Sequence, residues 1–178
     1  MAHHPEIPID TYVKMSRNDL SDLWFDAYGW IACYFAQLEG LSYALIDLLC
    51  DAQDKVRFKK LPYQKRMDQA RTMICAHFKA QGQMALADEW DAFLCEAKAA
   101  APLRNKILHN PLSINLALGD PLNNPDAGII LTHQPGQPVL KLGAVQEFAR
   151  SMLELNNRMQ DLLLRGQLIP QQSGNNIA

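Results

Sequence analysis

The run LSDLWFDAYGWIACYFAQLEGLSYALIDLL, residues 20–49, decides the fold, because its apolar side chains recur every three or four positions. That spacing places them on one face of an α-helix. The face is formed by Leu20, Leu23, Ala27, Ile31, Tyr34, Leu38, Leu41, Leu45 and Leu48. The run therefore predicts one long helix whose apolar seam needs other helices to cover it.

Three more helices are predicted from the same periodicity. Pro62 suits the first turn of a second helix, and Gly82 ends that helix. A third helix starts near Gln83 and carries its apolar residues toward the stretch at 99–112. The last helix covers residues 144–165, with Gly166 as its C-cap. Short connections between long helices favour antiparallel neighbours.

The segment between the third and last helices has a different texture. Short apolar runs at 112–118, 128–132 and 139–142 are separated by DPLNNPD and QPGQP. Such punctuation predicts a small β-hairpin or meander, and a plain loop is the alternative. The predicted fold class is all-α: a helical bundle of four main helices with this small β insertion before the last helix.

Length and cysteine usage bound the domain organisation and the compartment. A chain of 178 residues fits one domain, 1–178, with an N-terminal arm at 1–16 and a disordered tail at 167–178. Its four cysteines are far apart and form no C-x-x-C pair, which argues against a zinc site and a disulfide framework. Free thiols, the absence of a signal-peptide core and no bilayer-length apolar run predict a cytoplasmic protein without a membrane segment. No metal or cofactor is expected.

Charge is segregated along the chain although its net value is only −2. Residues 18–54 contain seven acidic and no basic side chains, whereas residues 55–79 contain eight basic side chains and one acid. This basic block is a candidate path for an RNA backbone. The candidate RNA-binding residues are Lys59, Lys60, Lys65, Arg66 and, outside the block, Lys106. The alternatives are a solvated face, or direct neutralisation by the acidic helix.

A second stretch, AAAPLRNKILHNPL at residues 99–112, carries the candidate chemistry. It brings Arg104, Asn105 and His109 within six residues of each other near the end of the third helix. Pro111 cannot continue that helix, and Pro102 either kinks it or begins a new one. At 100° per residue, Asn105 and His109 share a face and Arg104 flanks it.

The R-N-x-x-x-H pattern near the end of a long helix, in a mostly helical small protein, resembles the HEPN superfamily. The likeness in helix layout extends from about Leu20 to Arg165. The resemblance implies an all-α bundle that forms a homodimer and acts as a metal-independent endoribonuclease, in a toxin–antitoxin or phage-defence system with a cognate antitoxin or other partner protein. Some members are not nucleases, so the alternative is a non-enzymatic dimeric module that binds a protein or a nucleotide.

RNA cleavage without metal needs a proton acceptor, a proton donor and positive charge beside the phosphate. Histidine can serve as the acid or the base, and arginine offers a fork of donors matched to phosphate oxygens. Asn105 is expected to position a hydroxyl or to fix the imidazole tautomer. Glu39, in the middle of a helix expected to be largely buried, needs a cation, and Arg104 is the candidate; a solvent-facing Glu39 is equally compatible. The competing interpretation of the motif is structural: Arg104 caps a helix or pairs with an acid, and His109 and Asn110 bond backbone carbonyls at the helix end.

Overall fold

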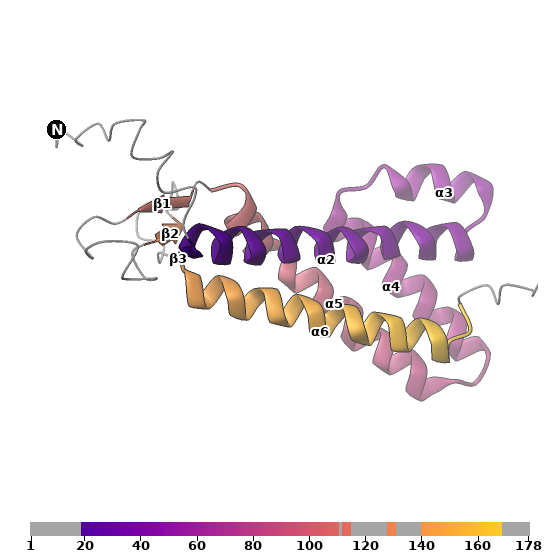
Figure 1. Cartoon of the computed structure of the whole chain (residues 1–178). Coiled ribbons are helices and arrows are strands. Elements are labelled where there is room, and N and C mark those ends of the chain that lie inside the picture. Colours follow the sequence, from indigo (N-terminus) through magenta and orange to yellow (C-terminus); the bar gives the residue numbers. More distant parts are fainter. Residues whose placement is uncertain (1–18, 111, 115–127, 131–139, 169–178) are drawn as a thin grey trace, which may run out of the picture. The chain divides into compact units, whose positions relative to one another are not determined.

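The long amphipathic run forms α2, Asp19–Leu49, in a computed structural model of the chain (Figure 1). The structure describes residues 19–110, 112–114, 128–130 and 140–168. Four further helices lie in this part of the chain: α3 Ala52–Lys59, α4 Tyr63–Ala80, α5 Met84–Leu108 and α6 Leu142–Arg165. The fold is an all-α helical bundle, which confirms the predicted class.

Helix α2 buries most of the predicted seam but not its two ends. Its central leucines and Ile31 are buried, whereas Leu23 and Leu48 are 44% and 54% exposed. At 100° per residue those two side chains fall on the edge of the stripe centred on Trp24 and Phe35, which are buried. The buried stripe therefore includes Trp24 and Phe35 beside the predicted seam, and Leu23 and Leu48 lie at its edge.

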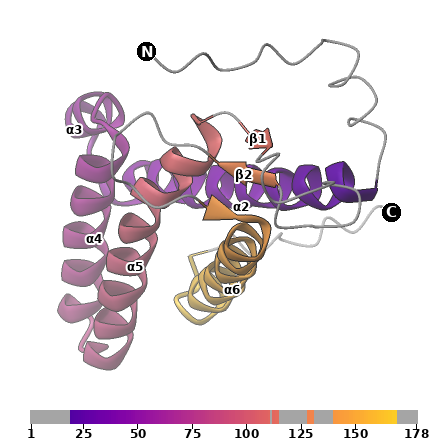
Figure 2. The same ribbon diagram turned by 90° about the vertical axis from the view of Figure 1, so that its left-hand side faces the viewer.

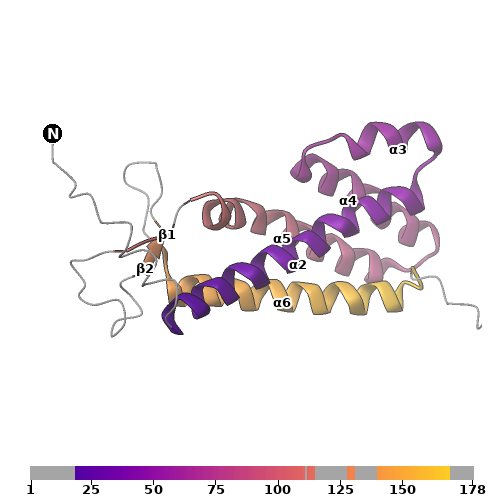
Figure 3. The same ribbon diagram turned by 45° about the horizontal axis from the view of Figure 1, so that its top comes forward.

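Helix α3 was not predicted, and it separates α2 from α4 as a short element of its own (Figure 3). Its start is fixed by Asp51, whose side chain accepts a hydrogen bond of 2.9 Å from the backbone nitrogen of Asp54. Phe58 is its one buried residue. A helix held by one cap and one buried side chain leaves no periodic pattern to detect.

The segment before α6 contains three short strands, β1 Leu112–Ile114, β2 Gly128–Ile130 and β3 Leu140–Lys141. They pair antiparallel in the order β1-β2-β3, and β1 and β2 lie side by side in Figure 2. Where the structure describes this segment, it therefore forms the predicted meander. The remaining parts of the three apolar runs, at 115–118, 131–132 and 139, lie outside the described residues. So do the predicted arm at 1–16 and the predicted tail beyond Leu168.

Two compact units are distinguished along the chain. We call them the motif unit, which comprises residues 1–32 and 104–150, and the ion-pair unit, which comprises 33–103 and 151–178. Helices α2, α5 and α6 each contribute a segment to both. The prediction of a single domain stays a prediction.

The ion-pair unit joins α4 to α5 as antiparallel neighbours, which appear side by side in Figure 2. The Tyr63 hydroxyl donates to the carbonyl oxygen of Ala97 at 3.1 Å. Further along, the Arg71 guanidinium donates to both carboxylate oxygens of Asp91, at 2.6 and 2.7 Å. A residue late in α5 thus meets the start of α4 and an earlier one meets its middle, as an antiparallel pair requires.

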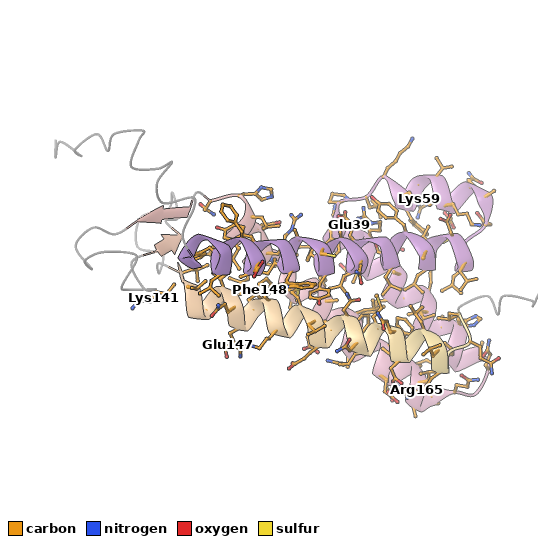
Figure 4. The ribbon with its side chains drawn as sticks, viewed as in Figure 1. Glu39, Lys59, Lys141, Glu147, Phe148 and Arg165 are labelled. Carbon is orange, nitrogen blue, oxygen red and sulfur yellow. The ribbon has the colours of Figure 1, made fainter. Side chains whose placement is uncertain are left out.

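The same unit joins α5 to the second half of α6 through two more ion pairs. Arg158 pairs with Glu96, and Arg165 with Glu89, again with opposite chain directions. Figure 4 labels Arg165 in the last turn of α6. Buried beneath them is an aromatic cluster, formed by Phe78, Trp90 and Phe93. Ion pairs at the surface and aromatic packing below hold these three helix segments together.

Helix ends follow the predicted chemistry at one site and depart from it at another. Gly82, with φ +75°, ends α4 in the left-handed conformation, as predicted. At the end of α6 the left-handed residue is Gln167, φ 52°, and not the expected Gly166. Gly166 instead meets a packing requirement, because a Cβ there would lie 2.8 Å from Cζ of Phe78. Glycine is used there for close packing, and the next residue takes the reversal.

Pro102 lies inside α5, which is continuous from Met84 to Leu108. The alternative in which Pro102 begins a new helix is therefore wrong. None of the described helices combines the length and the apolar composition that a membrane crossing requires.

Candidate functional site

The R-N-x-x-x-H motif lies where α5 ends, within the motif unit. Arg104 and Asn105 occupy its last turn and a half, and His109 is the first residue after Leu108. The backbone nitrogen of His109 still donates to the carbonyl oxygen of Asn105, at 3.0 Å. The helical geometry therefore extends to His109, and the three residues keep the placement that their spacing predicts.

Arg104 and Asn105 are joined directly through their side chains. Nη1 of Arg104 donates to Oδ1 of Asn105 at 2.8 Å. Arg104 is half-buried and Asn105 is exposed. The amide oxygen thus holds one arm of the guanidinium, and the amide NH₂ group of Asn105 faces a surface that solvent reaches. The expectation that Asn105 orients the imidazole or a hydroxyl stays a prediction, and the structure adds its hydrogen bond to the arginine.

His109 presents an exposed ring at the end of the helix. Its imidazole makes no hydrogen bond or ion pair with any residue that the structure describes. The ring is therefore accessible to a bound molecule, and imidazole is the side chain used most often in acid–base catalysis.

The structural interpretation of the motif holds for its neighbour. The amide nitrogen of Asn110 donates to the carbonyl oxygen of Lys106 at 2.6 Å, and so satisfies one of the open carbonyls of the last turn. His109 contributes only its backbone to the helix end. Asn110 therefore caps the helix, and the His109 ring takes no part in the cap.

Two aromatic side chains in the same unit have buried polar atoms that lack an acceptor. Neither Nε1 of Trp24 nor the hydroxyl of Tyr28 makes a hydrogen bond, and their ring centroids are 6.3 Å apart. Burial raises the pKa of Tyr28 from 10.0 to about 12. The phenol therefore stays protonated at neutral pH and is not a base for the motif.

Half of the eight basic side chains of the block form ion pairs with described residues. Lys59 Nζ lies 2.6 Å from Oδ1 of Asp47, and Arg66 Nη2 lies 2.6 Å from Oε1 of Glu39. Both acids belong to α2, so the acidic helix neutralises these two members of the block, as one of the predicted alternatives expects for the whole of it. As an RNA-binding residue Arg66 was wrongly predicted, because it is only 3% exposed.

Glu39 has a different cation from the one expected. Its carboxylate pairs with Arg66 in the ion-pair unit, whereas Arg104 belongs to the motif unit. Figure 4 labels Glu39 on α2 and Lys59 on α3. Arg66 also donates from Nε to Oγ of Ser42, at 2.8 Å, and from Nη1 to the carbonyl oxygen of Leu61, at 2.9 Å. The Glu39–Arg66 pair therefore helps to hold α2 against α4.

The other RNA-binding candidates keep their accessibility. Lys60 and Lys65 are exposed, and neither forms an ion pair with a described residue. Lys106 is half-buried in the last turn of α5, directly after Asn105 and three positions before His109. Within the described part of the chain, no three His, Cys, Asp or Glu side chains are grouped to hold a metal ion.

Comparisons with protein-family models, with curated proteins and with solved structures found no match to this chain. The likeness to the HEPN superfamily therefore rests on the motif and on the helix layout.

Sequence reasoning missed Arg66 as the centre of a buried network, because its two side-chain partners, Glu39 and Ser42, lie in α2 at 27 and 24 positions from it. It also missed the contact between Cys50 and Met73, which are 23 positions apart. No local pattern marks either contact. Only the pairing of helices brings them together.

Proposed function

We propose that the end of α5 is the active site of a HEPN-like, metal-independent endoribonuclease. One observation carries the proposal: a half-buried guanidinium fixed to Asn105 lies one helical turn before an exposed, unbonded imidazole. The fork of Arg104 supplies donors to the phosphate oxygens, where charge accumulates during cleavage. His109 supplies the titrating group.

The reaction is a transfer of the phosphoryl group within the RNA. The 2′-hydroxyl loses its proton to a base and attacks the phosphorus, and the bond to the 5′-oxygen breaks. That oxygen gains a proton from an acid, so the products are a 2′,3′-cyclic phosphate and a 5′-hydroxyl. His109 of one chain serves as one partner, and the His109 of a second copy in a homodimer serves as the other. The base takes one proton, the acid gives one, and no metal or water is consumed.

The decisive experiment is RNA cleavage by the purified full-length protein in EDTA. His109→Ala should lower the rate by about 10²- to 10⁴-fold, the usual contribution of a positioned acid or base. Arg104→Lys should also lose activity, because lysine keeps the charge but not the two-pronged geometry. His77→Ala is the matched control, since His77 lies on α4 and bonds only its neighbour Gln81. Cleavage that survives in His109→Ala would overturn the proposal.

The salt dependence of RNA affinity tests how RNA is held. Contacts from Arg104 and Lys106 alone predict a slope of log K against log salt of about −1.4, and adding Lys60 and Lys65 predicts about −2.8. A slope steeper than about −5 would mean that the ion-paired residues of the basic block leave their acidic partners and bind RNA, which contradicts the pairing described above. The inactive His109→Ala protein permits this measurement without cleavage.

A role in a toxin or phage-defence system, opposed by a cognate antitoxin, is part of the same proposal. Expression of the chain should arrest growth, and His109→Ala should relieve the arrest at equal protein level. Arrest that is identical with the variant would remove nuclease activity as its cause.

A second candidate, a non-enzymatic module that binds a protein or nucleotide, is favoured by a different observation. Leu23, Phe25 and Trp30 on α2 are 44%, 61% and 54% exposed, and they belong to the same unit as the motif. Large exposed apolar side chains are typical of interaction surfaces. This candidate is preferred if the protein does not cut RNA and if Phe25→Ser changes its oligomeric mass in light scattering.

A further inference from the structure

The ion-pair unit exposes apolar side chains along the side where α2 and α6 meet. The two helices lie side by side there, because Nδ2 of Asn156 donates to Oε1 of Gln37. Further along both helices an open groove of about 400 Å³ lies between them. Its one charged lining residue, Asp47, is ion-paired with Lys59. The apolar lining residues are Leu41, Ala44, Leu45, Leu48, Leu163 and Leu168.

Helix α6 carries a row of uncharged, exposed side chains beside this groove. Leu153 and Leu164 are 40% and 66% exposed, and Asn157 and Gln160 between them are exposed as well. These four residues, which we call the α6 stripe, are spaced by four, three and four positions, as the a and d positions of a coiled coil are. Leu163, directly before Leu164, lines the groove, so the stripe and the groove share an edge.

The charged side chains of this part of α6 lie outside the stripe. Arg158 pairs with Glu96, and Arg165 pairs with both Glu89 and Asp161. A partner that covers the stripe therefore removes no charge of the stripe from water, a step that is costly for an unpaired ion. The stripe also offers no charge that a partner of opposite sign would recognise. Its occupant has to match leucine with leucine and amide with amide.

We propose that the α6 stripe binds the same stripe of a second copy of this chain, in a parallel pair of α6 helices related by a two-fold axis. Equal positions then meet, so Leu164 packs against the partner's Leu164 and Asn157 faces the partner's Asn157. An asparagine at one a position fixes the register and the number of helices. Its amide carries both donors and an acceptor, so the two copies satisfy each other.

The parallel direction agrees with the homodimer proposed for RNA cleavage. It sets the first halves of both α6 helices, which belong to the motif units, at the same end of the pair. Pairing of the stripes does not depend on nuclease chemistry, because His109→Ala should associate as the parent does. Loss of the dimer and loss of cleavage are therefore measured separately.

The experiment measures the mass of the full-length protein by sedimentation velocity and light scattering. At micromolar concentration the parent should be a dimer of 20.0 kDa chains. Leu164→Glu and Leu164→Lys should each be monomeric, with a dissociation constant raised at least about 100-fold, because two like charges would meet in the pair. An equimolar mixture of the two variants should form a dimer again, because a carboxylate then meets an ammonium group.

The matched control is Val56→Glu, since Val56 is 59% exposed on α3 of the same unit. It should leave the dimer intact, and thermal unfolding checks that each variant folds. A parent that is monomeric throughout the micromolar range, or a mixture that stays monomeric, would contradict the pairing. So would a dimer that is restored by mixing Leu153→Glu with Leu164→Lys, which indicates an antiparallel pair. Dissociation by Phe25→Ser but not by Leu164→Glu would place the contact on α2 and exclude the α6 stripe.

Discussion

Replacing Arg66 by methionine should destabilise the protein more than any substitution at an exposed arginine. The Arg66 side chain is buried and donates to Glu39, Ser42 and the carbonyl of Leu61, at 2.6, 2.8 and 2.9 Å. Its guanidinium also lies 3.9 Å from the ring centroid of Tyr43. Methionine fills the space of the stem but makes none of these bonds.

The expected loss in the free energy of unfolding depends on the Glu39 carboxylate, which the substitution leaves without its partner. Removing one partner of a buried ion pair costs about 3–5 kcal/mol. The Glu39 side chain is 39% exposed, so water recovers part of its solvation, and the loss should fall near the lower end, about 3 kcal/mol. For a chain of this length that corresponds to a melting temperature lower by about 6–12 °C.

Urea and thermal unfolding of four proteins test this value. Glu39→Gln alone should cost about 3 kcal/mol, because it leaves the buried Arg66 guanidinium without a counter-charge. The double variant should lose less than the sum of the two, because each single change already breaks the pair. Arg57→Met is the matched control: its side chain is 71% exposed and lies 3.6 Å from Asp54, so the change should stay within about 0.5 kcal/mol. A loss below about 1 kcal/mol for Arg66→Met, or strict additivity in the double variant, would refute the reasoning.

Other contacts give further expected outcomes. Gly166→Ala should lower the melting temperature, because a Cβ there would lie 2.8 Å from the Phe78 ring. Gly40→Ala should raise it, because the helical site is open and alanine restricts the unfolded chain. Burial raises the pKa of Tyr28 from 10.0 to about 12, so in an absorbance titration compared with that of Tyr28→Phe its phenol should ionise near pH 12. Its contribution to the free energy of unfolding is full below pH 10 and is lost as the pH rises toward 12. The hydrogen bonds from Arg71 hold the pKa of Asp91 below its usual value of 3.8. The ion pair therefore stabilises the protein above pH 3.8, and this stabilisation is lost as the pH falls through the pKa of the folded state. Acid-unfolding curves of the parent and of Asp91→Asn should differ above pH 3.8 and converge below the folded pKa.

Helices with a sustained periodic pattern were predictable from the sequence. Helix α2 and helix α6 differ from their predicted bounds by only a few residues, because many apolar side chains per helix agree on one face. The meander was predictable from a different signal, the turn residues that interrupt its apolar runs. Both signals are local, and local signals need no knowledge of the partner segment.

Features that depend on a partner segment were not predictable. Gly166 was expected as a left-handed cap, yet Gln167 adopts that conformation, and Gly166 is needed because Phe78 occupies the space that a Cβ would fill. Helix α3 depends on Phe58 finding a buried site that no periodic pattern indicates. In each case the deciding atom belongs to a residue distant in sequence.

The candidate site divides in the same way. Placement of Arg104 and His109 at one helix end follows from their spacing and from Pro111, so it could be inferred from the chain alone. The cation of Glu39 could not, since a sequence contains many arginines and only the packing of α2 against α4 selects Arg66. Likewise, the basic block loses Lys59 as a free cation because Asp47, twelve positions earlier, lies within 2.6 Å of it.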